Sequence, residues 1–284
     1  MPSRFASRRD DGRLEDGRLE DRWYRATIGL GRQVLGAMDV TTRASGHEHL
    51  PLHGPALMAC THSSYPDFLF VGKAALRRAR YVRFMCRADI WDVPGVRRAM
   101  TGMQHIPVDR QAPAAAYLTA RRLLAQGEAI CGFPEAGISF SYAVRSLMPG
   151  LPALARETGL PIIPIAIWGA QRIWTLTPEN DAKGPGPDLT RGRVVDVTFG
   201  APIAVPPDAD LAETTTALGH VLTGMLEELQ LRPEHRPAPG EHAPWYPAHL
   251  GGHAPDRREA LAYDSVPHNA LAPTWGPPTP DPRP

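Results

Sequence analysis

Short apolar runs alternate with helical patterns along most of the chain. Strands are predicted where apolar residues stand together for a few positions, and helices where they recur every three or four residues. The predicted strands cover residues 56–61, 82–87, 103–108, 128–133, 161–168 and 193–200, and the predicted helices cover 68–80, 94–101, 114–126, 149–158 and 211–231. This alternation favours an α/β fold in which helices flank a mostly parallel central sheet, with the chemistry where strands end and loops begin.

One more helix is predicted ahead of these elements, over residues 22–43. Residues that suit a buried face recur in it at helical spacing, namely Trp23, Thr27, Leu30, Val34 and Met38. Arginines stand elsewhere on its surface. Two interpretations are open: the helix packs on its own domain, or its apolar face enters a membrane interface while the arginines meet anionic headgroups.

The two ends of the chain differ in composition from the middle. Residues 1–21 are charged, contain the sequence DGRLE twice in tandem and hold no apolar export segment. The last 53 residues hold 13 of the 31 prolines and show no sustained period, so residues 232–284 are expected to form an irregular tail. The working domain is then predicted to span residues 22–231, which is long enough to bury a sizeable core.

Composition and charge exclude several classes of protein. Apolar residues make up 43% and charged residues 21%, which excludes a disordered chain, a coiled coil and a collagen-like fibre. The net charge of +1 argues against a nucleic-acid binder, which usually carries a large basic excess. The longest uncharged apolar run, residues 158–171, has 14 residues, fewer than the ~18 that a membrane span needs. We therefore expect a cytoplasmic protein, with contact to a membrane surface left open.

Cysteine and histidine spacing gives little support for a metal site. Cys60, Cys86 and Cys131 stand far apart in apolar runs without Cys-x-x-Cys spacing, so buried free thiols are expected rather than disulfides or a zinc site. The histidines within residues 47–53 form a loose cluster without a nearby cysteine or a matching carboxylate. No metal is expected.

The stretch THSSYPDFLF, residues 61–70, follows a predicted strand and opens a predicted helix. His62 precedes the helix and Pro66 suits its first turn, so a turn between them can bring Asp67 back onto the imidazole. A carboxylate that accepts a hydrogen bond from one ring nitrogen fixes the tautomer and raises the basicity of the other nitrogen. The pair is then a candidate general base for a hydroxyl group. The alternative is a helix-capping aspartate beside a structural histidine.

Three further blocks follow in chain order. They are GMQHIPVDR at residues 102–110, GFPEAG at 132–137 and LPIIPIAIWG at 160–169. Together with His62 and Asp67 they resemble the four ordered blocks of the glycerolipid acyltransferase family, the PlsC-like enzymes that acylate lysophosphatidic acid or glycerol 3-phosphate. The resemblance covers roughly residues 45–205, about the whole predicted core.

The resemblance implies direct acyl transfer without a cofactor or a metal. His62 would be the general base and Asp67 its partner, and the acceptor hydroxyl would attack the thioester of acyl-CoA or acyl carrier protein without an acyl-enzyme. Arg110 would bind the acceptor phosphate, for which a guanidinium offers bidentate, charge-assisted hydrogen bonds. Glu135 would bind an acceptor hydroxyl or hold a nearby arginine. The acceptor-shaping block would consist of Phe133, Pro134 and Glu135.

The third block departs from the family pattern. Ala136, Gly137 and Ile138 stand where the family usually has Gly-Thr-Arg, so the second phosphate-binding arginine is missing from its place. Arg145 is expected to replace it, with Arg172 as the alternative. This difference from the family pattern bears on which acceptor is used more than on the type of reaction.

The expected function is therefore acylation of a lysophosphatidic-acid-type acceptor in phospholipid biosynthesis. Acceptors that stay open are glycerol 3-phosphate, a lyso-phospholipid and a glycolipid. Two other classes also stay open. One is a catalytically inactive lipid-binding relative, and the other is a serine esterase that uses Ser139 or Ser141.

A basic run lies between residues 73 and 98. It holds eight lysines and arginines against two aspartates, a local net charge of +6. Such a run is either a solvated face or a surface that attracts anionic lipid, at ~1 kcal/mol per basic residue. It also suits the phosphates of CoA or an acidic carrier protein. Together with the helix at 22–43, it predicts a peripheral protein on the inner face of the plasma membrane.

Overall fold

The computed structural model describes residues 19–177 and 186–278. Its sheet has seven strands in the order β1-β7-β6-β2-β5-β3-β4. All neighbouring strands are parallel except β6 and β7. The strands are β1 (Thr41–Ser45), β2 (Ala56–Cys60), β3 (Val82–Arg87), β4 (Ile106–Val108), β5 (Ala129–Gly132), β6 (Ile162–Trp168) and β7 (Val194–Phe199). The predicted α/β fold with a mostly parallel sheet is confirmed.

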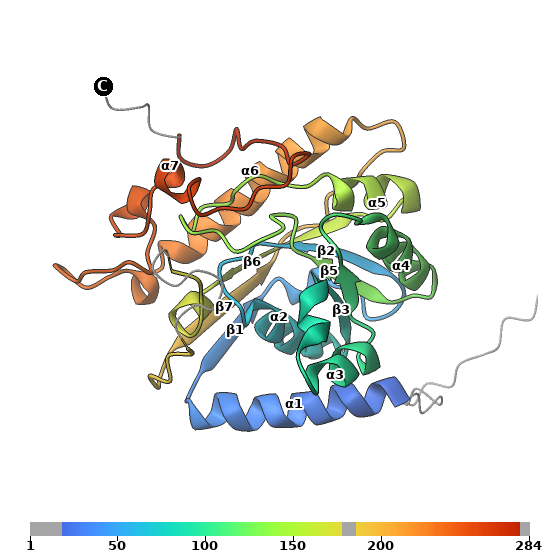
Figure 1. Ribbon diagram of the computed structural model, residues 1–284, viewed down its shortest axis with the longest axis horizontal. Coiled ribbons are helices and arrows are strands. Elements are labelled where there is room, and N and C mark those ends of the chain that lie inside the picture. The colour runs from blue at the N-terminus through green and yellow to red at the C-terminus, as the bar shows by residue number, and fades with distance from the viewer. Residues whose placement is uncertain (1–18, 178–185, 279–284) are drawn as a thin grey trace, which may run out of the picture.

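Helices cover both faces of the sheet (Figure 1). They are α1 (Leu19–Ala37), α2 (Asp67–Ala75), α3 (Val96–Gly102), α4 (Ala114–Ala125), α5 (Gly150–Thr158), α6 (Leu211–Gln230) and α7 (Arg257–Ala260). Helix α2 packs in one buried apolar cluster, whereas α4, α5 and α6 pack in another on the opposite face. Successive residues of β2 alternate between the two clusters, Leu57 and Ala59 in one, Met58 and Cys60 in the other. The central strands are therefore covered on both faces, as a continuous apolar run predicts.

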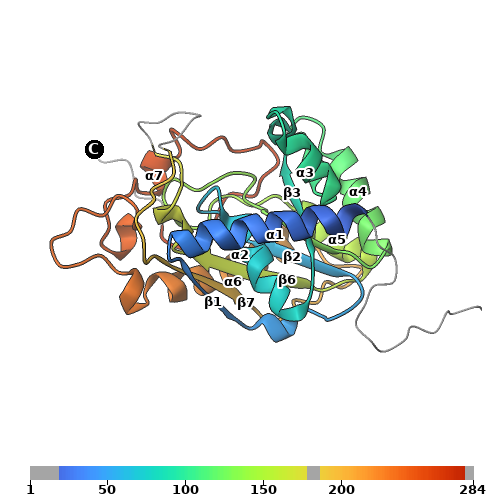
Figure 2. The same cartoon turned by 90° about the horizontal axis from the view of Figure 1, so that it is seen from below.

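The N-terminal helix is shorter than the sequence pattern predicts. Helix α1 ends at Ala37, and residues 41–45 form strand β1 beside β7, so the predicted helix over 22–43 is wrong at its C-terminal end. This five-residue, largely polar strand has no apolar run to reveal it. Helix α1 crosses the α2 face of the sheet (Figure 2) and is held there by Tyr24, whose ring stacks on Tyr81 at 4.4 Å. Leu30 and Val34 stay exposed on its outer side.

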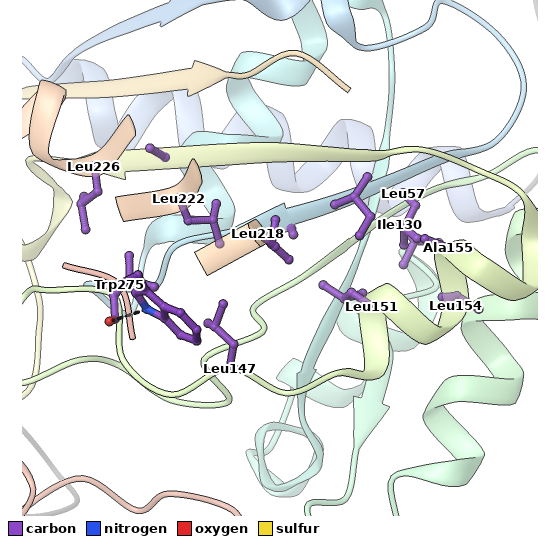
Figure 3. Close-up of a cluster of buried hydrophobic side chains, with 14 of the residues drawn as sticks. Leu57, Ile130, Leu147, Leu151, Leu154, Ala155, Leu218, Leu222, Leu226 and Trp275 are labelled. Atoms are coloured by element: carbon purple, nitrogen blue, oxygen red, sulfur yellow. Dashed lines mark hydrogen bonds between the residues drawn. The ribbon is translucent and has the colours of Figure 1, made fainter. Parts of the chain in front are cut away.

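The described part of the tail packs on the body of the protein. Tyr246 and Trp275 are each only 1% exposed, and Leu271 pairs with Leu147 as an antiparallel bridge. The indole of Trp275 lies among apolar side chains of α6 and the 144–147 segment and donates to the carbonyl of Val144 at 3.1 Å (Figure 3). Gly219 of α6 makes room for this ring, because a Cβ there would stand 2.4 Å from it.

Two further observations concern the ends and the membrane. The charged segment predicted over 1–21 and the last residues of the tail lie largely outside the described residues, so the predicted domain boundaries stay predictions. Within the described ranges, none of the helices has the length and apolar character needed to cross a bilayer.

Candidate active site

The carboxyl ends of four neighbouring parallel strands carry the chemistry-bearing residues. His62 follows β2, Glu135 follows β5, Arg87 ends β3 and Arg110 follows β4. Since these strands run parallel, their ends meet along one edge of the sheet, where sites of α/β folds form. The structure thus brings the predicted blocks to one edge.

His62 and Asp67 form the predicted pair. The Nδ1 of His62 lies 2.9 Å from Oδ2 of Asp67, whose side chain is fully buried. The same oxygen accepts the backbone N–H groups of Ser63 at 2.8 Å and Ser64 at 2.9 Å, and the Ser64 hydroxyl donates to Oδ1. Asp67 is the first residue of α2, where free N–H groups and the helix dipole favour a carboxylate. Pro66 supplies the turn ahead of the helix.

The geometry leaves the second nitrogen of the imidazole free to act. Because Asp67 is acceptor-only as a carboxylate, the proton lies on Nδ1 and Nε2 carries the lone pair. The His62 side chain is 20% exposed, and its ring stacks on Phe133 with centroids 4.3 Å apart. The ring is neither sealed in the core nor turned away from its carboxylate. It has the placement that a general base needs.

The carboxylate of Glu135 accepts backbone hydrogen bonds from two separate segments, one at His62 and one at Arg145. Its Oε1 accepts the N–H of His62 at 2.7 Å, and its Oε2 accepts the N–H of Arg145 at 3.0 Å. The residue is 2% exposed, and burial raises the pKa of its carboxyl to about 7, although both N–H groups and the charge of Arg145 lower it. With both oxygens in use, Glu135 holds the backbone in place instead of facing an acceptor. Of its two predicted roles, the structure favours contact with an arginine, through the main chain.

Ala136 and Gly137 follow Glu135 in the third block, where the family pattern has glycine and threonine. Ala136 has φ +53°, a left-handed conformation that glycine adopts without cost, and the family pattern has glycine there. Gly137 lies between two guanidiniums, because a Cβ at this position would stand 3.2 Å from Nη1 of Arg145 and 3.6 Å from Nη2 of Arg110. Pro134 is buried and its carbonyl accepts the N–H of Met148 at 2.8 Å.

The arginines at this edge differ in availability. Arg110 is exposed and makes no hydrogen bond or ion pair within the described ranges. Its pKa is lowered by lost hydration and then by the charges of Arg87 and Arg145. Arg87 was not among the sequence candidates. It pairs with Asp89 at the surface, where both side chains are more than half exposed. Arg87 could have been found from the sequence, because it ends the predicted strand at 82–87 and lies inside the basic run.

The two expected replacements for the missing arginine already have partners. Arg145 is buried and donates to Oδ1 of Asp264 at 2.9 Å and to the carbonyl of Ser265 at 2.7 Å. Arg172 lies over the ring of Trp245, 3.9 Å from its centroid. Arg145 therefore presents no free cation to a ligand, so its predicted phosphate role has no geometric support. Arg172 is stacked on an aromatic ring without an anionic partner among the described residues, and its phosphate role stays a prediction.

Other sequence candidates are placed as follows. The hydroxyl of Ser139 is buried, donates to the carbonyl of Ala143 at 2.7 Å and lies beside the hydroxyl of Ser141. Within the described ranges this hydroxyl makes no hydrogen bond to an imidazole, which argues against a serine esterase. The cysteines are free, and Cys60 and Cys131 are buried as predicted, whereas Cys86 is only partly buried, so the prediction of burial is wrong for it. In the described ranges, histidines, cysteines and carboxylates form no group that could hold a metal.

The basic run is only partly a surface feature. Arg80 is buried and donates to the carbonyls of Pro51 and Gly54, and buried Arg83 pairs with Glu128. Two of the eight charges therefore stabilise the fold. Of the other six, Lys73 donates to the hydroxyl of Thr42 and Arg78 to the carbonyl of Leu50, whereas Arg87 and Arg97 pair with aspartates at the surface.

Comparisons with known proteins show similarity to acyltransferases. Residues 41–168 match the family model described as Acyltransferase. The chloroplastic 1-acyl-sn-glycerol-3-phosphate acyltransferase LPAT1 of Arabidopsis thaliana is 27% identical over 132 residues, which are 45% of this chain and 36% of that protein. The 1-acyl-sn-glycerol-3-phosphate acyltransferase of Bacillus subtilis is 28% identical over 123 residues, 43% of this chain and 60% of that protein. The aligned part thus spans less than two thirds of either relative.

A solved structure shares the fold. The crystal structure of the 1-acyl-sn-glycerophosphate acyltransferase PlsC from Thermotoga maritima matches with a TM-score of 0.60 and 21% identity. The match covers 77% of this chain and 85% of that chain.

Proposed function

We propose that this chain, whose residues 41–168 match the Acyltransferase family model, acylates a lysophosphatidic-acid-type acceptor in phospholipid biosynthesis, as the names of its curated relatives suggest. The donor is acyl-CoA or acyl carrier protein. The observation that carries the proposal is the His62–Asp67 pair at the carboxyl end of β2. Nδ1 of His62 lies 2.9 Å from Oδ2 of Asp67, and the His62 side chain is 20% exposed.

The residues support a one-step transfer. Nε2 of His62 removes the proton of the acceptor hydroxyl as the oxygen attacks the thioester carbonyl carbon. The carbon–sulfur bond then breaks, and the imidazolium returns the proton to the leaving thiolate. Asp67 stabilises the imidazolium in between. No enzyme nucleophile is needed, which agrees with the buried hydroxyl groups of Ser139 and Ser141.

Arg110 binds the acceptor phosphate in this proposal, assisted by Arg87. Both stand at the same edge as His62, and their mutual repulsion is relieved when an anion lies between them. Asp89 would release Arg87 at little cost, since exposed ion pairs are worth only about 0–1 kcal/mol.

The membrane contact is a further part of the proposal. Leu30 and Val34 are 63% and 49% exposed on α1, with arginines on the same helix, which suits an anionic lipid surface such as the inner face of the plasma membrane. Co-sedimentation with anionic vesicles tests it. Equal binding by a Leu30→Ser, Val34→Ser variant would exclude this surface.

An acyltransferase with another acceptor is the second candidate. The observation that favours it is the absence of a second free arginine from the third block, where Ile138 stands and Arg145 is paired with Asp264. Glycerol 3-phosphate, lyso-phospholipids and glycolipids are the acceptors to compare. An inactive lipid-binding relative is disfavoured by the intact His62–Asp67 pair.

One assay tests the function. Radiolabelled acyl-CoA and acyl carrier protein are offered with phosphorylated and unphosphorylated acceptors to the wild type and to His62→Ala. We expect transfer to lysophosphatidic acid, and a loss of about 10²–10⁴-fold in the variant, with the fold intact by circular dichroism. Full activity of the variant would exclude the mechanism, and preference for an acceptor without phosphate would favour the second candidate. Binding to vesicles without transfer from any donor would favour the inactive relative.

A further inference from the structure

A segment of the tail, residues 256–277, crosses the 144–147 segment next to the candidate site, and we call it the C-terminal strap. Arg257 and Trp275 both donate to the carbonyl of Val144, at 2.8 and 3.1 Å. Leu271 and Leu147 exchange backbone hydrogen bonds at 3.1 and 2.8 Å. The strap thus holds the main chain on both sides of Arg145.

Asp264 of the strap holds the side chain of Arg145 itself. Its carboxylate accepts from Nη1 at 2.9 Å, and the next carbonyl, of Ser265, accepts from Nη2 at 2.7 Å. The two side chains are 6% and 5% exposed, so this is a buried ion pair. Removing one partner of such a pair leaves an uncompensated charge in the interior, which forces the neighbourhood to rearrange.

Arg145 is in turn one of the two residues that hold Glu135. Its N–H reaches Oε2, and the N–H of His62 reaches Oε1 of the same carboxylate. A continuous chain of contacts therefore runs from Asp264 through Arg145 and Glu135 to the backbone of His62. These residues also interact electrostatically, because the charge of Asp264 raises the pKa of Glu135 and the charge of Arg145 lowers it.

We propose that Asp264 is a positioning residue for acyl transfer, which acts through Arg145 and Glu135 on the placement of His62. The inference rests on the proposed function. It assigns the strap a part in the reaction although none of its residues touches the base. It also explains why Arg145 is withheld from the acceptor: its guanidinium is used to fix the 144–147 segment.

The test compares Asp264→Ala with Asp264→Asn in the full chain, well below the unfolding midpoint of each. Alanine removes the bond to Arg145, so kcat should fall by about 10–100-fold with little change in the KM of donor or acceptor, since a displacement near 1 Å can cost ~10²-fold. Asparagine keeps an acceptor oxygen for Arg145 but not the charge, so kcat should recover most of the loss that alanine causes. Because asparagine lacks the charge, the pKa of Glu135, followed by ¹³C NMR of labelled glutamate, should fall.

Glu259→Gln is the matched control. Glu259 lies in the same strap, accepts the N–H of Asp256 at 2.9 Å and does not contact Arg145, so kcat should stay at the wild-type value. The inference is overturned if Asp264→Ala keeps wild-type kcat, or if its activity falls only with the folded fraction. It is also overturned if only the acceptor KM falls, which would mean that Asp264 merely masks a phosphate-binding cation.

If Asp264→Ala does not fold, Asp264→Asn decides: an unchanged pKa of Glu135 overturns the inference. A wild type that transfers no acyl group overturns the proposed function, and the catalytic part of this inference with it. An active wild type with unaffected Asp264 variants overturns the inference alone.

Discussion

Replacing Asp67 by asparagine separates its charge from its hydrogen bonds. The amide oxygen can take the place of Oδ2, which accepts from His62, Ser63 and Ser64, and the amide nitrogen can donate to the Ser64 hydroxyl. Stability should therefore change only by the lost charge at the N-terminus of α2, about 0.3–1 kcal/mol. Alanine would instead leave two buried N–H groups unpaired, at about 1–3 kcal/mol each.

The effect of asparagine on turnover should be much larger. His62 Nδ1 and the carboxylate are 2.9 Å apart, so the charge centres of imidazolium and carboxylate stand at about 4 Å, worth about 4 kcal/mol at an effective dielectric constant near 20. With a factor of ten per 1.4 kcal/mol, kcat should fall by about 10³-fold. Release of the CoA thiol, followed with a chromogenic thiol reagent, measures this, and urea unfolding measures stability. A kcat within tenfold of the wild type in a folded Asp67→Asn protein would refute the role of Asp67.

Three further predictions follow from the site. Arg110→Ala should raise the acceptor KM far more than the donor KM, and equal effects in steady-state kinetics would remove its phosphate role. Between pH 4.5 and about 7 the unfolded chain has ionised Glu135 while the folded protein retains the proton, so this residue should lower wild-type stability by about 3 kcal/mol as pH rises through that range. Urea unfolding of Glu135→Gln should lack this slope, and the same slope in both proteins would contradict the assignment. Ala136→Gly should stabilise by up to about 1 kcal/mol, because it relieves a left-handed alanine, and a clear loss of stability would show that the turn is not strained.

The fold was predictable where burial determines the pattern. Leu57, Ile130 and Ile163 lie in strands covered on both faces, so their neighbours are apolar without interruption and the strands stand out. The His62–Asp67 contact was predictable because it is local, five residues apart with a proline between. Each of these features depends on residues close together in the chain.

The remaining features depend on contacts between distant parts of the chain. Strand β1 exists because Thr41 to Ser45 pair with β7, about 150 residues later, and its own residues carry no strand pattern. The partner of Arg145 lies 119 residues away, in a proline-rich tail without periodicity. The positive charge of Arg145 made it a candidate for the site, but only the folded structure shows that its guanidinium is already paired with Asp264.

The buried indole of Trp275 has a consequence for how the protein is made. This ring closes the apolar layer between α6 and Leu147, so the layer stays open until nearly all of the described chain has left the ribosome. A nascent chain that ends earlier would display Leu147, Leu218 and Leu222 to water and to chaperones. Emergence of Trp275 from the ribosome, not formation of the sheet, would then set the moment at which this apolar layer becomes fully packed.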